Sequence, residues 1–188
     1  MPVMQSEEGV NGMLGKILLV DIDKCVGCYA CEVACKQENQ LSLPSRWCIV
    51  TRVGPRKIRD EMHLDFVPGL CLQCEDPTCS YFCSVDAIIK REDGIVAIDK
   101  EKCTGCGLCV YGCPYGAIYI DKERKTVGKC SLCISRIDHG LEPSCVQHCI
   151  SGSLRFVTQE ELAEITRGMH LAVRGSVCYT SSKWKLTL

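Results

Sequence analysis

The sequence has few aromatic residues, and few apolar residues of any kind once cysteine is set aside. Only 6% of the 188 residues are Phe, Trp or Tyr, and the hydrophobic fraction of 46% counts 18 cysteines. Without them the apolar fraction falls to roughly 36%, which is thin for an ordinary core. Small domains with thin cores need additional cross-links, and metal sites can supply them. We therefore expect metal centres to form much of the core and the apoprotein to fold poorly.

The sequence also lacks the signals of several function classes. It has no phosphate-cradling glycine loop, no nucleophile elbow and no paired-carboxylate signature, so we expect no substrate chemistry from this chain alone. The formal net charge is -1, which argues against binding to nucleic acid. The first residues have no basic start, and no run approaches the ~20 apolar residues of a membrane helix. We therefore expect no signal peptide, no membrane insertion and a cytoplasmic location.

What the sequence has instead is cysteine, arranged in four groups of four. Each group opens with C-x-x-C and closes with C-x-x-x-C, and we call these groups quartets one to four in chain order. The quartets are Cys25, Cys28, Cys31 and Cys35; Cys71, Cys74, Cys79 and Cys83; Cys103, Cys106, Cys109 and Cys113; and Cys130, Cys133, Cys145 and Cys149. This spacing lets a backbone wrap a cubane iron–sulfur cluster and lend its last cysteine to a neighbouring cluster. The quartets therefore predict four [4Fe–4S] clusters, which together make a path for electrons.

The quartets differ in how specific they are. Quartet three, C-T-G-C-G-L-C-V-Y-G-C-P, matches the C-x2-C-x2-C-x3-C-P run of bacterial ferredoxins, including Pro114. Quartet one has the same spacing, with Lys36 in the place of the proline. The middle loop of quartet two is longer, and quartet four has a long gap between its second and third cysteines. Taken alone, quartet four also fits a four-thiolate zinc site.

An internal repeat and short elements surround the quartets. The run D-I-D-K-C-V-G-C at 21–28 resembles D-K-E-K-C-T-G-C at 99–106, and glycine lies between the first two cysteines of both. A residue without Cβ lets backbone N–H groups approach the cluster sulfurs. The expected elements are a short helix after each cluster loop, a hairpin of 87–89 with 95–98, a hairpin of 117–120 with 126–127, strands over 17–20 and 153–157, and a helix from a capping box at Thr158 and Glu161 to about Arg167.

Other segments hold no expected cluster ligand. Residues 37–68 contain three prolines and are expected to be irregular, with a strand or two. The segment after Gly168 is expected to be extended and available to clasp a partner. Cys48 and Cys178 fall outside the quartets and are expected to be buried structural thiols. His148, beside a quartet cysteine, either donates a hydrogen bond to a cluster sulfur or lies on a helix surface.

The four quartets, in this order and spacing, resemble the four-cluster iron–sulfur subunit of molybdenum- and tungsten-pterin oxidoreductases. That family includes formate dehydrogenase and the nitrate and dimethyl sulfoxide reductases. The resemblance covers about residues 16–157, and its most specific stretches are C-V-G-C-Y-A-C-E-V-A-C-K-Q-E-N and K-C-S-L-C-I-S-R-I-D-H-G-L-E-P-S-C. The short sequence is most similar to the small electron-transfer subunits of tungsten aldehyde oxidoreductase and of tungsten benzoyl-coenzyme A reductase.

The resemblance implies an α+β, loop-rich fold. It consists of two pseudo-symmetric 2[4Fe–4S] ferredoxin-like modules with short helices and small antiparallel hairpins. The implied divisions are an N-terminal tail at 1–15, a first module at 16–68 and 126–157, a second module at 69–125, and a C-terminal helix with an extended tail at 158–188.

The resemblance also implies how the cysteines share the clusters, because it pairs quartet one with four and quartet two with three. The implied sites are site I, held by Cys25, Cys28, Cys31 and Cys149; site II, held by Cys35, Cys130, Cys133 and Cys145; site III, held by Cys71, Cys74, Cys79 and Cys113; and site IV, held by Cys83, Cys103, Cys106 and Cys109. Ser84 and Ile150 follow a fourth cysteine where the family pattern differs. Three clusters plus one other or empty site therefore stays an alternative.

The implied function is to relay single electrons between a larger tungsten- or molybdenum-pterin catalytic subunit and a further redox protein. In this interpretation the chain is a non-catalytic subunit of an oxidoreductase complex. One alternative is a free-standing polyferredoxin that carries electrons by diffusion. Another is a zinc-binding interaction module, which would be colourless. Copurification with a larger partner separates the first two interpretations.

Overall fold

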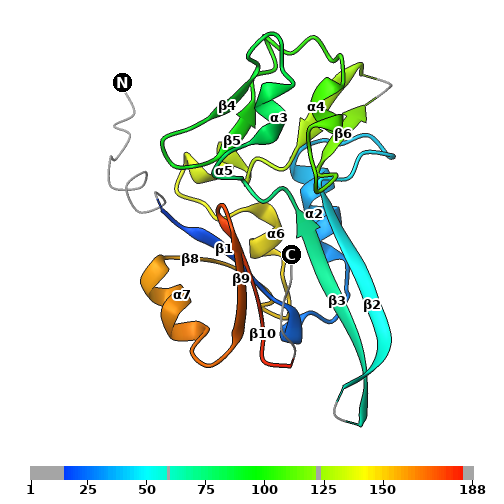
Figure 1. Ribbon diagram of the computed structural model, residues 1–188, viewed down its shortest axis with the longest axis vertical. Coiled ribbons are helices and arrows are strands. Elements are labelled where there is room, and N and C mark those ends of the chain that lie inside the picture. Colours follow the sequence, from blue (N-terminus) through cyan, green and yellow to red (C-terminus); the bar gives the residue numbers. More distant parts are fainter. Residues whose placement is uncertain (1–14, 59, 122–123, 184–188) are drawn as a thin grey trace, which may run out of the picture.

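The computed structural model describes residues 15–58, 60–121 and 124–183. Within these residues the fold mixes short helices with one four-stranded sheet and three two-stranded hairpins. Figure 1 shows the four-stranded sheet at one end of the molecule and two small hairpins with two helices at the other. The α+β, loop-rich fold expected from the sequence is confirmed in this form. The expected N-terminal tail, apart from Gly15, lies outside the described residues.

The four-stranded sheet joins the two ends of the described chain. Its order is β8 (Leu154–Val157), β1 (Ile17–Asp21), β10 (Val177–Ser181) and β9 (His170–Arg174). Strand β1 pairs antiparallel with β8 and parallel with β10, and β9 and β10 form an antiparallel hairpin. The strands expected near 17–20 and 153–157 are therefore present, and they are neighbours in the sheet.

The sheet has a buried face on each side. Leu18 and Val20 point into the main core, whereas Leu19 points to the other face. There the helix α7 (Gln159–Ile165) covers it through Leu162. Helix α7 begins with the expected capping box: the hydroxyl of its N-cap residue Thr158 accepts from the N–H of Glu161, whose side chain accepts from the N–H of Thr158.

The segment after Gly168 differs from the expected free tail. It forms the β9–β10 hairpin, and all five residues of β10 are buried in the centre of the sheet. The turn of this hairpin packs on the first loop of quartet two, where Ser176 N–H donates to the carbonyl of Leu72 at 3.2 Å. The described part of this segment is therefore a structural strand pair, because it completes the sheet and supports a cluster loop.

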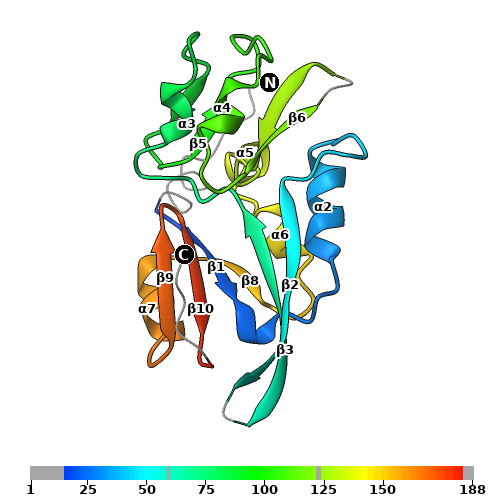
Figure 2. The same cartoon turned by 45° about the vertical axis from the view of Figure 1, so that its right-hand side comes forward.

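The segment before quartet two is also more regular than expected. Strands β2 (Cys48–Ile58) and β3 (Glu61–Leu70) pair along nearly their whole length, and Figures 1 and 2 show their tip extending beyond the body of the molecule. The register shifts at a bulge between Val53 and Arg56, which accommodates a proline without an N–H to donate. The two strands were expected, but the irregular course was wrong for these residues.

The two short hairpins match the sequence prediction. Strand β4 (Ile88–Lys90) pairs with β5 (Val96–Ile98), and β6 (Ile118–Asp121) pairs with β7 (Thr126–Lys129). Because β6 and β7 belong to one hairpin, the expected boundary between residues 125 and 126 divides a paired unit. A boundary after β7 agrees better with the hydrogen bonds.

Short helices hold the third cysteine of three quartets and turn the chain toward the fourth. Helix α2 (Ala30–Glu38) packs against α6 (Ser144–Gln147), and α3 (Thr78–Tyr81) packs against α4 (Leu108–Tyr111). Helix α5 (Ile134–Ile137) follows the first pair of cysteines in quartet four. The helix that carries quartet one therefore contacts the helix of quartet four, and the helices of quartets two and three contact each other.

Asp23 fastens the end of the described chain to the 3-10 turn after β1, Ile22–Lys24. Its carboxylate accepts from Ser181 Oγ at 2.8 Å and from the N–H and Oγ of Ser182 at 2.6 Å each. Burial alone would raise the pKa of Asp23, but the hydrogen bonds from Ser182 and Ser181 and the nearby Lys183 ammonium lower it overall. A lowered pKa means that this carboxylate stabilises the fold above its ordinary pKa, and that the stabilisation is lost as pH falls through the lower folded value.

We predict that Asp23→Ala loosens the β9–β10 hairpin. The loss of hydrogen bonds to a charged acceptor should speed amide exchange in β10 about tenfold at neutral pH, equivalent to about 1.4 kcal/mol of local stability. Hydrogen exchange followed by mass spectrometry on the anaerobic protein measures this. Glu164→Ala, which removes an exposed carboxylate on α7, is the control. Equal exchange in Asp23→Ala and the wild type would contradict the role given to Asp23.

Candidate iron–sulfur cluster sites

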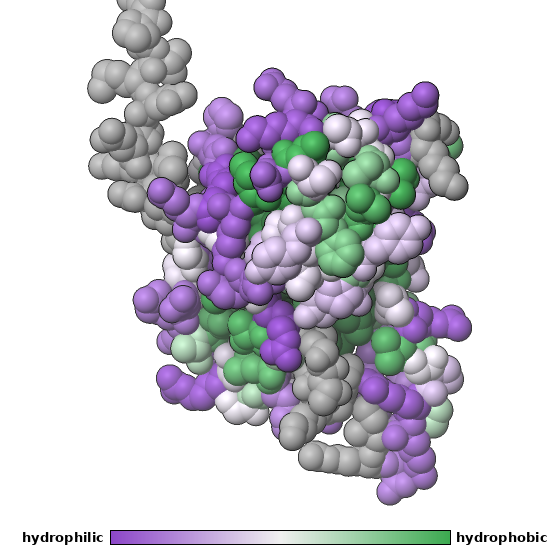
Figure 3. All heavy atoms as spheres, turned by 45° about the horizontal axis from the view of Figure 1, so that its top comes forward, coloured by the Kyte–Doolittle hydropathy of each residue, from purple (hydrophilic) through white to green (hydrophobic). Residues whose placement is uncertain are grey.

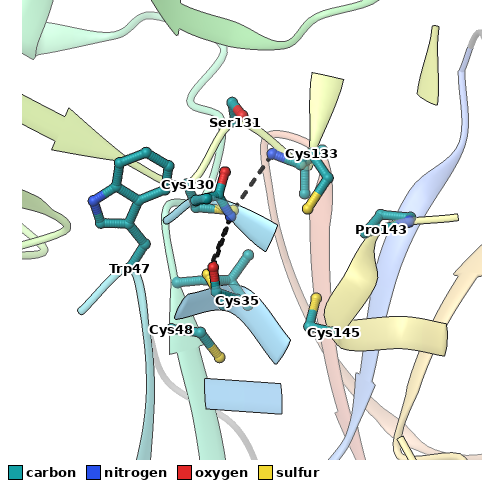
Figure 4. Close-up of a pocket in the computed structure, with 11 residues that line it drawn as sticks. Cys35, Trp47, Cys48, Cys130, Ser131, Cys133, Pro143 and Cys145 are labelled. Atoms are coloured by element: carbon teal, nitrogen blue, oxygen red, sulfur yellow. Dashed lines mark hydrogen bonds between the residues drawn. The ribbon is translucent and has the colours of Figure 1, made fainter. Parts of the chain in front are cut away.

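Four cysteines from two distant quartets line one cavity near the centre of the molecule. These are the members of site II: Cys35, Cys130, Cys133 and Cys145. In Figure 4 the sulfurs of Cys133 and Cys145 point toward one another, and Trp47 lies to one side. Further apolar side chains on the cavity wall belong to Leu70 and Leu132. The structure thus gathers the thiols of one quartet-one residue and of three quartet-four residues, which lie far away in the sequence, around one dry space.

Two further cavities are each lined by four cysteines. The members of site III, Cys71, Cys74, Cys79 and Cys113, line one of them. The members of site IV, Cys83, Cys103, Cys106 and Cys109, line the other. The three cavities have similar empty volumes, about 360 Å³ at site II, 340 Å³ at site III and 320 Å³ at site IV. Similar volumes with the same four donors indicate the same kind of bound group at each.

The members of site I are gathered less tightly. Cys25, Cys31 and Cys149 are near enough for their charges to interact. Cys28 is exposed on the same loop as Cys25, whereas Cys31 is buried on α2. Three of the four residues implied for site I therefore lie together, and the fourth is on the loop that borders them.

All four C-x-x-C loops share one backbone feature. The residue before the second cysteine has a positive φ: +67° at Gly27, +54° at Gln73, +72° at Gly105 and +52° at Leu132. This conformation is inexpensive for glycine and costs roughly 1–2 kcal/mol for residues with a Cβ. Quartets two and four therefore use the same loop as quartets one and three, although their sequences lack the glycine.

The two strained residues have side chains that are part of the core. Gln73 is 1% exposed, and its amide nitrogen donates to the carbonyl of Cys130 at 2.9 Å. Its amide oxygen accepts from the N–H of Val96 at 2.9 Å. Leu132 is 2% exposed and lines the cavity of site II. Since both side chains are held by these surroundings, packing compensates for the cost of the backbone conformation.

The closing cysteine of each of three quartets accepts a hydrogen bond from the backbone just after it. Ala87 N–H donates to Cys83 Sγ at 3.2 Å, and Ala117 N–H donates to Cys113 Sγ at 3.3 Å. Leu154 N–H donates to the Sγ of the closing cysteine of quartet four at 3.3 Å. These bonds stabilise a thiolate, and hydrogen bonds to sulfur tune the potential of a cluster.

Quartet one makes the equivalent contact with a side chain. Here α2 continues past Cys35, so the N–H of Asn39 donates to the carbonyl of Cys35 at 3.1 Å. The side-chain amide of Asn39 then donates to Cys35 Sγ at 3.7 Å. Lys36, in the place of the proline, leaves the helix intact, which explains why this quartet departs from the other three.

The thiols of the cavities have raised pKa values. Burial, with repulsion from Cys133 and Cys31, raises the pKa of Cys35 to about 12. Burial also raises the pKa of Cys79 to about 11, although the Lys129 ammonium lowers it in part. For Cys145, burial again raises the pKa well above its ordinary value. Closely placed, buried thiolates therefore need a positive counter-charge, which ferrous and ferric ions supply when a cluster is bound.

Among the described residues, no group of three or more His, Cys, Asp or Glu side chains is drawn together as the ligands of one metal ion. A single zinc ion would hold its thiolate sulfurs at about 2.3 Å from the metal. A cubane spreads its four irons, and therefore the cysteines that bind them, over a larger volume. Four thiols around a cavity are the arrangement that a cluster needs, so the donor sets of sites II, III and IV fit it.

The cysteines outside the quartets are both buried, as expected. Cys178 is 0% exposed and packs with Leu19 under α7, on the side of the sheet away from the main core. Cys48 is 4% exposed but lines the cavity of site II. A hydrogen bond with Cys48 lowers the pKa of Cys31, and the same contact together with burial raises the pKa of Cys48. Cys48 is therefore the protonated donor beside a ligand, a role that sequence reasoning missed.

His148 lies on the surface, and the alternative of a sulfur contact is not seen. Its Nδ1 is 2.8 Å from the carbonyl of Ser144, one turn earlier on α6. Lys129 and Gln73, in contrast, are buried polar residues beside the cysteines that the sequence alone does not single out. The alternation in T-V-G-K places Lys129 on the same face as the buried Val127, but it does not reveal which groups meet that face.

Thiol-lined cavities, held by short helices and hairpins and built on a repeated cysteine loop, define a ferredoxin-like protein that binds several [4Fe–4S] clusters. Comparison with known families agrees with this class. The family model described as "4Fe-4S dicluster domain" matches residues 62–159, just over half of the sequence. The protein belongs to this 4Fe-4S dicluster family.

Curated relatives are similar over longer stretches. The sequence is 39% identical over 137 residues to the iron–sulfur-type B component of tetrathionate reductase from Salmonella typhimurium, covering 72% of this chain and 55% of that protein. It is 34% identical over 175 residues to the nitrate-inducible formate dehydrogenase iron-sulfur subunit of Escherichia coli, covering 84% and 60%. It is 36% identical over 141 residues to the B component of polysulfide reductase from Wolinella succinogenes, covering 74% of each. The resemblance to the iron–sulfur subunits of such oxidoreductases is confirmed, and the sequence spans less than two thirds of the first two relatives.

We predict that Gly105→Ala weakens one cluster site. A Cβ at this position would lie 2.2 Å from the carbonyl oxygen of Lys125, and the backbone has a positive φ. The loop should shift, with a loss of about a quarter of the iron if one of four clusters is lost. Gly116→Ala is the matched control, because Gly116 also has a positive φ but has no atom within 4 Å of the added Cβ. Iron analysis of both variants checks this, and full iron in Gly105→Ala would refute the close approach.

Proposed function

We propose that the protein is an electron-transfer subunit of a molybdenum- or tungsten-pterin oxidoreductase. It relays single electrons through four [4Fe–4S] clusters between a larger catalytic subunit and another redox protein. The observation that supports this most is that three of the four implied cysteine sets each line their own cavity. When bound, the clusters supply reversible one-electron chemistry, and the chain's own residues hold, space and insulate them.

The two-module arrangement is part of this proposal. The contact of α2 with α6 supports a module built from quartets one and four, and the contact of α3 with α4 supports one built from quartets two and three. Within each module a quartet lends its closing cysteine to the partner set, which brings neighbouring clusters close together. The two modules meet where Cys71 of site III approaches Cys130 of site II. The proposed order along the molecule is therefore site I, site II, site III, site IV.

The exposure of the cysteines supports electron exchange at the two ends of this row. Of the eighteen cysteines, only Cys28 and Cys106 are exposed. Cys28 belongs to site I and Cys106 to site IV, whereas site II has only buried members. A buried middle protects the clusters from solvent, and exposed ends allow a partner's redox centre to approach.

Apolar side chains surround both exposed cysteines. Near site IV, Tyr111 is 83% exposed, and Phe82 and Val85 line the cavity while remaining accessible to solvent. Figure 3 shows apolar and weakly polar side chains gathered on one face, with charged side chains at its margin. Beside Cys28, Val26 is 60% exposed and Tyr29 is 43% exposed. Exposed apolar patches of this kind favour protein partners at both ends.

The remaining details of the proposal stay predictions. They are the similarity to small subunits of tungsten enzymes, the cytoplasmic location and the identity of both partners. The described residues include no helix long and apolar enough to cross a membrane. A free-standing polyferredoxin is the alternative, and family relatives named as parts of reductases and dehydrogenases favour the subunit.

We predict that Cys106→Ser interrupts electron flow. The variant should lose the cluster of site IV, while the other clusters and the loading of a copurified catalytic subunit stay intact. Anaerobic iron and sulfide analysis, together with the rate of reduction of the physiological acceptor, measures both effects. Cys178→Ala, which removes a buried thiol away from the cavities, should keep its full iron. Unchanged electron flux in Cys106→Ser would refute the electron path through site IV.

We predict that Tyr111→Lys weakens one partner contact without loss of iron. A charge placed at the centre of the patch over site IV should lower the affinity for that partner at least tenfold, because interface centres exclude charge. Leu171→Lys, on the edge strand β9, is the control for adding a lysine at an exposed apolar position. Quantitative copurification from the native host checks the result. Elution of the wild-type protein by itself, at its own mass of 20.8 kDa, would favour the free carrier instead.

A further inference from the structure

A buried lysine lies between the two proposed modules. Lys129, the last residue of β7, is only 3% exposed. Its ammonium group donates to Cys71 Sγ at 3.4 Å, to the carbonyl of Cys130 at 3.0 Å and to the carbonyl of Val96. It therefore connects β5, quartet two and quartet four within one small region.

The partners of Lys129 leave its charge without a carboxylate. Among the described residues, no ion pair joins this ammonium to Asp or Glu, and its three acceptors are a sulfur and two neutral carbonyls. A buried ammonium is costly unless an opposite charge compensates it. Lys129 also lines the cavity of site III. The group with four thiolates that this cavity fits is negatively charged, and it is the counter-charge that the protein places beside Lys129.

This contact differs from the other hydrogen bonds to quartet sulfurs. In the described part of the chain, the other donors to sulfur are backbone N–H groups, such as those of Ala87 and Ala117, the amide of Asn39 and the hydroxyl of Ser151. All of these are neutral. A full positive charge at 3.4 Å from a ligand sulfur, shielded from water, has a much larger electrostatic effect than a neutral dipole.

We propose that Lys129 raises the reduction potential of the cluster at site III relative to the other clusters. The inference rests on the proposed function, because it requires a cluster at that site. When this cluster accepts one electron from its neighbour, its net charge becomes more negative by one, and the neighbour becomes less negative by one. The fixed ammonium stabilises the more negative state, so the electron is held more strongly at site III.

The position of Lys129 makes it a positioning residue for charge in the middle of the electron path. It is attached by sequence to Cys130 of site II and by hydrogen bond to Cys71 of site III. Its effect on site II should be smaller, because there it contacts the carbonyl of the ligand rather than the sulfur. Sites I and IV, at the ends of the row, should be least affected.

The test is a redox titration of the holoprotein followed by electron paramagnetic resonance. Lys129→Met removes the charge and keeps the length and apolar stem of the side chain. We expect iron and sulfide content to be unchanged, and the equilibrium constant for reduction of one cluster to fall at least tenfold, which is about 59 mV for one electron. The affected cluster is assigned to site III if its signal is the one missing in Cys79→Ser.

Two further variants separate an electrostatic role from a structural one. Lys129→Gln is neutral but still donates to the carbonyls, so it should shift the same cluster in the same direction as Lys129→Met. Lys125→Met removes an exposed lysine from the same β6–β7 hairpin and should leave every potential unchanged. A potential at site III that is unchanged in both neutral variants, with the cluster present, overturns the proposal.

The remaining outcomes are also decisive. If both neutral variants lose the cluster at site III, Lys129 has a structural role and the proposal is wrong. If all clusters shift equally, the effect is not centred on site III and the proposal is again wrong. Wild-type protein without iron and sulfide would instead refute the proposed function, and this result is distinct from a loaded protein in which Lys129 has no effect.

Discussion

Repulsion between neighbouring thiolates is the constraint on which the rest of the structure depends. Each cavity gathers four cysteine side chains in surroundings that raise their pKa values, so the arrangement is unfavourable until positively charged iron is present. The chain has few large apolar residues to compensate for this by packing. Its remaining devices all lower the cost of negative charge: N–H groups directed at sulfur, one buried ammonium, and C-x-x-C loops with a left-handed residue. The clusters and the fold are therefore one stabilising system.

Much of the local structure was predictable from the sequence. The cysteine spacing predicted which residues gather, the Asp93-Gly94 pair predicted the β4–β5 hairpin, and Thr158 with Glu161 predicted the start of α7. These signals succeed because each depends on neighbours within a few positions. The division of cysteines among sites came from a resemblance, and the cavities of sites II, III and IV support it.

The features that the sequence did not predict depend on distant contacts. Strand β10 lies beside β1 although they are at opposite ends of the described chain, and nothing in V-C-Y-T-S alone indicates that both of its faces are covered. The three prolines of 37–68 suggested an irregular course, but a bulge accommodates Pro55 within a long hairpin. Gln73 and Leu132 adopt a conformation typical of glycine because tertiary packing holds their side chains. Lys129 is polar and would ordinarily be expected at the surface, and only the fold shows it beside Cys71.

The most direct test of the central claim is a crystal structure of the anaerobically isolated protein with anomalous data measured at the iron absorption edge. The account predicts four iron centres in a row, each bound by one of the cysteine sets of sites I to IV, with Lys129 between the second and third. Iron at these cavities with a different division of the cysteines would contradict the two-module arrangement. Empty cavities, or single zinc ions in place of clusters, would contradict the account as a whole.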